Sequence, residues 1–164
     1  MRHKFHGLEI YNHSSQCENG SGYALSHWDG MLNHNTDFLG FATDDSHFIP
    51  EQPYWKGGWI MVNAADCTQQ EILENIRRGN FYSTQGPEFK TIEFGENSVS
   101  VETSAVTYVR LIGPRRTGQW VHALGKNPIF RAEFDLSCDW PYARLEIEDA
   151  GGKRAWSNPL WFFE

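Results

Sequence analysis

The chain has 164 residues, and its 14 Lys and Arg residues against 21 Asp and Glu residues give a formal charge of −7. With 40% apolar and 21% charged residues, this length is enough to bury a core in one domain or two small ones, and it excludes a disordered chain. The absence of any run of about 18 apolar residues excludes a membrane-spanning helix, and the acidic balance argues against nucleic-acid binding.

The first half of the chain alternates predicted strands and helices. Strands are predicted at residues 8–11, 38–42 and 59–62. A polar loop rich in Ser, Asn and Gly is expected at residues 12–22, and a short helix is expected to begin at Ser26, a favoured N-cap residue. Thr68 and Glu71 form a capping box that begins a second helix, and Gly79 marks the end of that helix. This order is typical of an α/β domain.

The second half consists of short alternating apolar segments, separated by turns that contain Gly and Pro. Strands are predicted at residues 91–94, 99–103, 106–112, 120–124, 129–134, 142–148 and 160–163. Such spacing is typical of an antiparallel β-sandwich. The alternation places six side chains inside it: Val99, Val101, Val109, Leu111, Leu145 and Ile147. We expect the boundary at Gly86–Pro87, which gives an α/β domain at 1–86 and a β-sandwich at 87–164.

The three cysteines and the N-terminus bear on the compartment of the protein. Cys17, Cys67 and Cys138 are too few and too widely spaced for a disulfide framework or a zinc site of common spacing, so reduced, inert thiols are the simpler interpretation. No apolar segment with a small-residue cleavage site follows the N-terminus, so no signal peptide is recognised. These features favour a cytoplasmic protein. Because a strand is predicted so early, we also expect the chain to be a fragment of a longer protein.

Asp45 and His47, after the strand predicted at residues 38–42, are the clearest candidates for chemistry. In an extended segment, residues two apart project to the same side, so both side chains can reach one divalent ion. Carboxylate and neutral imidazole together suit Zn, Mn or Fe, and Asp44 adds a second acid. The motif alone is weak, because an Asx turn beside a solvated histidine has the same sequence.

Six further motifs occur in a specific order along the chain. They are Gly-Leu-Glu-Ile-Tyr-Asn at 7–12, Trp-Asp at 28–29 with Met-Leu at 31–32, Gly-Phe-Ala-Thr-Asp-Asp-Ser-His at 40–47, Gly-Trp-Ile-Met-Val at 58–62, Gly-Asn-Phe-Tyr-Ser-Thr-Gln-Gly-Pro at 79–87 and Ala-Trp-Ser-Asn-Pro-Leu-Trp at 155–161. In this order they resemble the C-terminal part of the PHP-domain metal-dependent hydrolases (polymerase and histidinol phosphatase superfamily), over roughly residues 7–163. The resemblance implies the last strands of a distorted β/α barrel, followed by an antiparallel β-sandwich. It also implies phosphoester hydrolysis by a metal-bound water, with Asp45 and His47 as the last pair of metal ligands.

The chain departs from this family at the first metal ligands. The family carries an H-x-H motif on its first barrel strand, and this sequence contains none. A catalytic metal needs about three protein ligands, and the remaining candidates for a third are His6, His13, His27 and His34. We therefore expect an incomplete site that hydrolyses phosphoesters slowly or not at all. An open barrel edge would favour self-association or a partner chain.

Four more residues are candidates for the site or for the pocket of a small phosphorylated substrate in an intact relative. They are Glu9, Asp44, His27 and Trp55. Each also has a simpler interpretation, because a strand Glu, a turn Asp, a His at a helix start and a Trp packed on a neighbouring element all occur without any catalytic role.

The second hypothesis for the whole chain is a non-catalytic protein. In it, the β-sandwich is an interaction or carbohydrate-binding module, and the α/β part is a remnant of a barrel. Four tryptophans bear on this choice, and we favour the sandwich core over a sugar-stacking face for them: Trp120, Trp140, Trp156 and Trp161.

Overall fold

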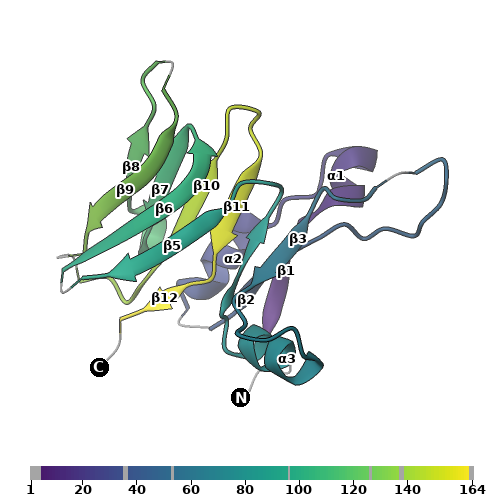
Figure 1. Cartoon of the computed structure of the whole chain (residues 1–164), viewed down its shortest axis with the longest axis horizontal. Helices are drawn as coiled ribbons and strands as arrows, with labels where there is room; N and C mark the ends of the chain where they lie inside the picture. The colour runs from purple at the N-terminus through teal and green to yellow at the C-terminus, as the bar shows by residue number, and fades with distance from the viewer. Residues whose placement is uncertain are drawn as a thin grey trace. The chain divides into compact units, whose positions relative to one another are not determined.

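The structure is a computed structural model, and it describes residues 5–34, 37–52, 54–95, 97–125, 127–136 and 139–162. The chain divides into two compact units, Met1–Gln85 and Gly86–Glu164. Figure 1 shows the helices in the first unit and the larger share of the strands in the second. Predictions that concern Cys138 and Phe163 lie outside the described residues.

A parallel strand pair organises the first unit. Strands β1 (Gly7–Asn12) and β2 (Leu39–Thr43) pair in parallel, so that Asn12 lies opposite Thr43. Parallel neighbours require a crossover connection, which here contains α1 (His13–Asn19) and α2 (Leu25–Leu32). The side chain of Trp28 is fully buried on α2 and donates a hydrogen bond of 2.8 Å to the carbonyl of Phe38, so the crossover is attached to the start of β2.

Helix α1 corrects the prediction of a loop at residues 12–22. The side chain of Asn12 accepts a hydrogen bond of 2.8 Å from the N–H of Ser15, and Gly20 ends the helix in the left-handed region at φ 77°. The Ser- and Asn-rich composition was misleading, because the same residues favour loops and helix caps. Helix α2 begins at Leu25, so Ser26 lies inside the helix and does not cap it.

Two more strands and a helix complete the first unit. They are β3 (Trp59–Val62), α3 (Gln69–Arg77) and β4 (Phe81–Thr84), with β3 and β4 antiparallel. The predicted capping box is confirmed on the Thr68 side, because Thr68 Oγ1 accepts a hydrogen bond of 3.3 Å from the N–H of Glu71. Strand β4 was not predicted. Its Ser83 hydroxyl accepts from the N–H of Ala42 and donates to the carbonyl of Gly40, both at 2.8 Å, which ties β4 to β2.

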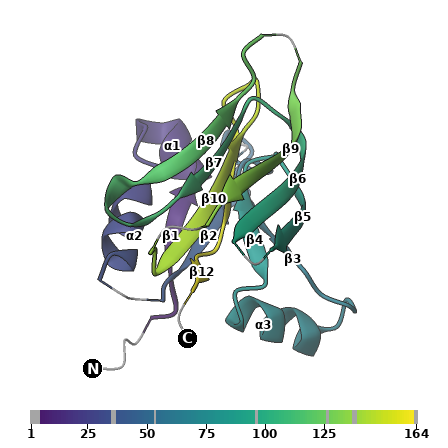
Figure 2. The same ribbon diagram turned by 90° about the vertical axis from the view of Figure 1, so that its left-hand side faces the viewer.

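The second unit contains two mostly antiparallel sheets, consistent with the predicted β-sandwich. One sheet has the order β5–β6–β9, and in the other β10 pairs with β7, β11 and β12 while β8 pairs with β7 (Figure 2). Their bounds are β5 (Phe89–Phe94), β6 (Ser98–Val106), β7 (Tyr108–Ile112), β8 (Gly118–His122), β9 (Ile129–Asp135), β10 (Tyr142–Glu148), β11 (Arg154–Ser157) and β12 (Leu160–Trp161). Within the described part of this unit, the single helix is the short 3₁₀ turn η1 (Pro114–Arg116).

The predicted core of the second unit is confirmed. All six side chains expected inside are at most 1% exposed: Val99, Val101, Val109, Leu111, Leu145 and Ile147. Two details differ from the prediction, since the strand expected at residues 106–112 is divided between β6 and β7 at Thr107, and β11 was not predicted. Trp156 belongs to the core at 1% exposure, whereas the core assignment of Trp120 is wrong because its side chain is 67% exposed.

A barrel is not established by the strands of the first unit. Among the described residues, β1 and β2 form the parallel pair, and β3 and β4 pair antiparallel. The barrel therefore stays a prediction from the resemblance. Within the part of the chain that the structure describes, no helix is both long enough and apolar enough to span a membrane.

Candidate functional site

Polar side chains meet where β1 and β2 end. Because the strands are parallel and in register at Asn12 and Thr43, their carboxyl ends form one edge. The carboxylate of Glu9 accepts a hydrogen bond of 2.5 Å from Thr43 Oγ1 on one oxygen and a bond of 3.1 Å from Asn12 Nδ2 on the other. Glu9 therefore lies at the carboxyl-end edge although it is three residues before the end of its strand.

Asp45 completes this edge from the segment after β2. Its Oδ2 accepts hydrogen bonds from Asn12 Nδ2 at 3.1 Å and from Ser14 Oγ at 3.5 Å. One amide nitrogen thus holds two exposed carboxylates, those of Glu9 and Asp45, side by side. We call Glu9, Asn12, Thr43 and Asp45 the acidic edge. Two neighbouring carboxylates repel each other, and a cation placed near both would relieve that repulsion.

The neighbouring Asp44 has a different role. Its Oδ1 accepts hydrogen bonds from the N–H groups of Gly57 and Gly58, both at 2.8 Å, and its Oδ2 accepts from the N–H of Lys56 at 2.7 Å. The carboxylate thereby closes the long connection between β2 and β3 onto the end of β2. These three bonds make Asp44 an anchor of the connection.

His47 lies in this connection, and its backbone setting differs from the prediction. The expectation that Asp45 and His47 project to one side assumed an extended segment. The backbone turns at Asp45, which has a φ of 51° in the left-handed region, so the alternation argument fails there. The ring of His47 is exposed and makes no hydrogen bond to any described residue, so it is accessible to a ligand.

The other predicted site residues do not join the acidic edge. His27 on α2 is exposed, and Trp55 is 55% exposed with the Nζ of Lys56 at 4.7 Å from its ring. Across the described residues, no group of three or more His, Cys, Asp or Glu side chains is arranged to hold a metal ion. Of the histidines proposed as a third ligand, His13 instead contacts Tyr11 and Cys17.

Sequence reasoning missed three polar partners of the acidic edge. Asn12 and Thr43 end the two parallel strands, and Ser14 begins α1 next to them. The signal that could have found Asn12 and Thr43 is their position, because each follows the last apolar residue of a predicted strand.

Comparison of the chain with protein-family models, with curated proteins and with solved structures finds no match. A functional assignment therefore depends on the residues of the acidic edge and on the order of the sequence motifs.

Proposed function

We propose that this chain is the C-terminal region of a PHP-like, metal-dependent phosphoester hydrolase, in which Asp45 and His47 are metal ligands. The observation that carries the proposal is the acidic edge. Two exposed carboxylates share the Nδ2 of Asn12 at the carboxyl ends of two parallel strands. This is the end of the strands at which the active sites of β/α barrels lie.

The donor types fit a divalent ion, but their arrangement does not complete a site. Carboxylates of Glu9 and Asp45 and the imidazole of His47 are ligands that suit Mn, Zn or Fe, and the described residues do not bring three such side chains together around one point. When bound, such an ion lowers the pKa of a water towards neutrality and offsets the charge on phosphoryl oxygens. Asn12 positions the two carboxylates through its hydrogen bonds at 3.1 Å. Since the described residues hold no complete group of three ligands, further ligands must come from elsewhere.

A phosphatase assay tests whether the site is complete. We expect p-nitrophenyl phosphate with Mn²⁺ or Zn²⁺ to be hydrolysed no more than a few times faster with the chain than without it, because roughly three protein ligands are needed to retain a catalytic metal. His47→Ala should remove any such increase, and the control variant His122→Ala, at a histidine of β8 in the second unit, should leave it unchanged. Robust turnover that is lost in His47→Ala alone would show that one chain forms a competent site. That result would contradict the expectation that the metal site of this chain is incomplete.

The second candidate function, a binding module, rests on an apolar hollow of about 600 Å³ in the second unit. Its described lining is Phe94, Gly95, Leu136, Trp140, Pro159, Leu160, Trp161 and Phe162. Aromatic rings of this kind can stack on sugars, but sugar specificity also needs polar groups that fix the hydroxyls. The described lining offers no polar side-chain group besides the indole N–H groups of its two tryptophans, so the hollow supports the module less well than the acidic edge supports the hydrolase.

A further inference from the structure

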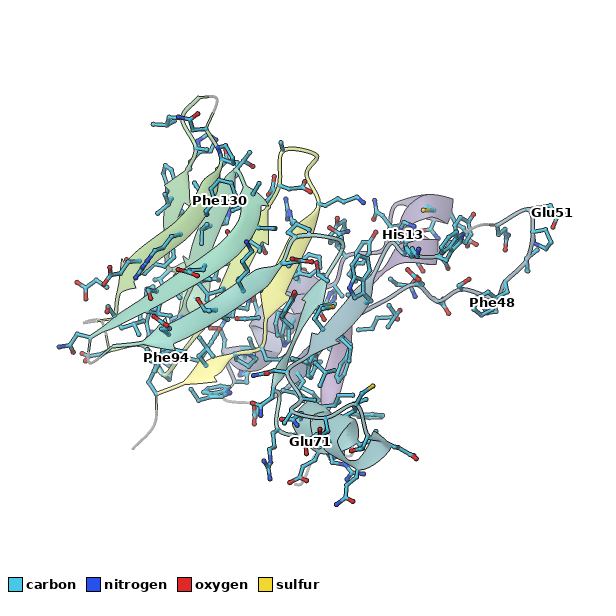
Figure 3. All side chains as sticks on the ribbon, viewed as in Figure 1. His13, Phe48, Glu51, Glu71, Phe94 and Phe130 are labelled. Carbon is cyan, nitrogen blue, oxygen red and sulfur yellow. The ribbon has the colours of Figure 1, made fainter. Side chains whose placement is uncertain are left out.

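A thiol and an imidazole form a pair on α1, the helix that follows Asn12 of the acidic edge. Cys17 is a free, exposed cysteine one helical turn after His13, and its Sγ lies 3.6 Å from His13 Nε2 and 3.9 Å from Nδ1. Figure 3 labels His13 near the base of the β2–β3 connection, which carries Phe48 and Glu51 further out. The distance of 3.6 Å lies within hydrogen-bonding reach of a sulfur atom.

The imidazole is held in this position by residues of β1 and of the β2–β3 connection. Tyr11 Oη lies 2.9 Å from His13 Nδ1, and the Tyr54 ring packs edge-on against the imidazole with ring centroids 6.4 Å apart. Gly57 has no side chain, and a Cβ there would lie 2.1 Å from the His13 ring. A residue with a side chain at position 57 would therefore clash with the imidazole, so the position of the His13 ring requires glycine there.

We infer that Cys17 is a reactive thiol, activated by His13, and that it exchanges with small-molecule disulfides such as oxidised glutathione. The proton of the Cys17 thiol passes to the imidazole of His13, whose two ring nitrogens both lie within 4 Å of Sγ. The Sγ then attacks one sulfur of the disulfide, the S–S bond breaks, and the other half leaves as a thiolate. Cys17 is oxidised to a mixed disulfide, and the departing half is reduced.

The other titratable groups around the pair do not compete with His13 for the proton of the Cys17 thiol. Burial is the main cause that raises the pKa of Tyr11, and its neighbours Tyr23 and Cys17 add to the shift. Tyr11 therefore stays protonated near pH 7 and can orient the imidazole without competing for the thiol proton. Tyr54 contacts the imidazole through its ring, and the Asp44 carboxylate is occupied by three backbone N–H groups.

The chain supplies its own control thiol. Cys67 is also free and exposed, and among the described residues no histidine nitrogen lies within hydrogen-bonding distance of it. The experiment uses the full chain with Cys138→Ser and measures the reaction of Cys17 and Cys67 with excess 5,5′-dithiobis(2-nitrobenzoic acid) at pH 7, each site being assigned by peptide mass spectrometry. We expect Cys17 to react roughly ten times faster than Cys67, because thiolate formation sets the rate.

Variants then assign the effect to the imidazole. His13→Gln should bring the Cys17 rate down to about that of Cys67, while the control His34→Gln should change neither rate. Oxidised glutathione should form its first mixed disulfide at Cys17. Equal rates for the two thiols in the parent chain, or a Cys17 rate that His13→Gln does not change, would overturn the inference. If His13→Gln loses the native circular dichroism spectrum, the variant is not used, and the rates of Cys17 and Cys67 in the parent chain decide whether Cys17 is the more reactive thiol.

Discussion

Three ion pairs of the second unit converge on Glu146 of β10. Its side chain is 5% exposed. Its oxygens lie 3.1 Å from Arg110 Nη1, 3.6 Å from Arg144 Nη1 and 3.8 Å from Arg154 Nη1, and they accept a hydrogen bond of 3.0 Å from Trp156 Nε1. Removal of this carboxylate would take the ion pair from the buried Arg144 and the hydrogen bond from Trp156, whereas Arg110 and Arg154 would keep their pairs with Glu148.

We therefore predict that Glu146→Ala lowers the free energy of unfolding by about 3–5 kcal/mol. The matched control is Glu102→Ala, because the pair of Glu102 with Arg131 is 3.9 Å long and both side chains are at least 50% exposed. The control should lose less than about 1 kcal/mol. Urea unfolding followed by circular dichroism measures both changes, and equal losses would show that the ion pairs of Glu146 contribute no more than an exposed pair.

Phe48 carries backbone strain in the β2–β3 connection. Its φ is 55°, in the left-handed region that disfavours bulky residues, and its side chain is 88% exposed, so little burial offsets the strain. Phe48→Asn should raise the free energy of unfolding by about 0.5–1 kcal/mol, because Asn tolerates this conformation. Ile49→Asn is the control, since Ile49 does not have a positive φ. A thermal shift that is the same for both variants would contradict the explanation.

At the scale of elements, the sequence predicted most strands and the longest helix, but it missed α1, β4 and β11. Helix α3 was predictable because Thr68 caps it and Gly79, with φ 76°, follows its end. The six alternating side chains of the second unit were predictable because successive side chains of a strand point to opposite faces of the sheet. When every second residue is apolar, only one face of the strand can be the buried one. Helix α1 was missed because two turns of polar residues have no apolar stripe, and only the caps Asn12 and Gly20 mark it.

Asn12 has two structural tasks, and a pair of cap variants separates them. Asn12→Ala removes the N-cap of α1 and the amide that joins Glu9 to Asp45, whereas Thr68→Ala removes only the N-cap of α3. Each should cost about 1 kcal/mol of unfolding free energy. Only Asn12→Ala should also weaken Mn²⁺ binding, by about tenfold or more. Calorimetric titration checks this, and equal affinities for the two variants would contradict the positioning role of Asn12.

The candidate site was predictable only in part, because some of its residues are far apart in the sequence. Asp45 and His47 are found by their spacing, but the partners of Asp45 come from β1 and α1, more than 30 residues earlier in the chain. Parallel pairing creates this proximity, and no local pattern encodes it. The left-handed backbone at Asp45 likewise could not be inferred from a short Asp-Ser-His segment.

At the scale of the whole molecule, the edge of β1 bears on assembly. Within the described residues, β1 pairs with β2 and makes one isolated bridge, between Tyr11 and Tyr23. A strand edge with few partners favours association with another chain. We therefore predict that the purified chain self-associates or co-purifies with a partner. Light scattering over a range of concentrations checks this, and the mass of a lone monomer throughout would contradict it.

The central claim is that Asp45 and His47 bind a divalent metal ion. Its most direct test is the binding of Mn²⁺ to the full chain, measured from the loss of the free-ion signal in electron paramagnetic resonance. We predict measurable binding that is weakened about tenfold or more by Asp45→Asn and by His47→Gln. The controls Asp66→Asn and His122→Gln alter residues of the same types that are not candidate ligands and should leave the affinity unchanged. No binding at millimolar Mn²⁺, or equal weakening by the control variants, would contradict the claim.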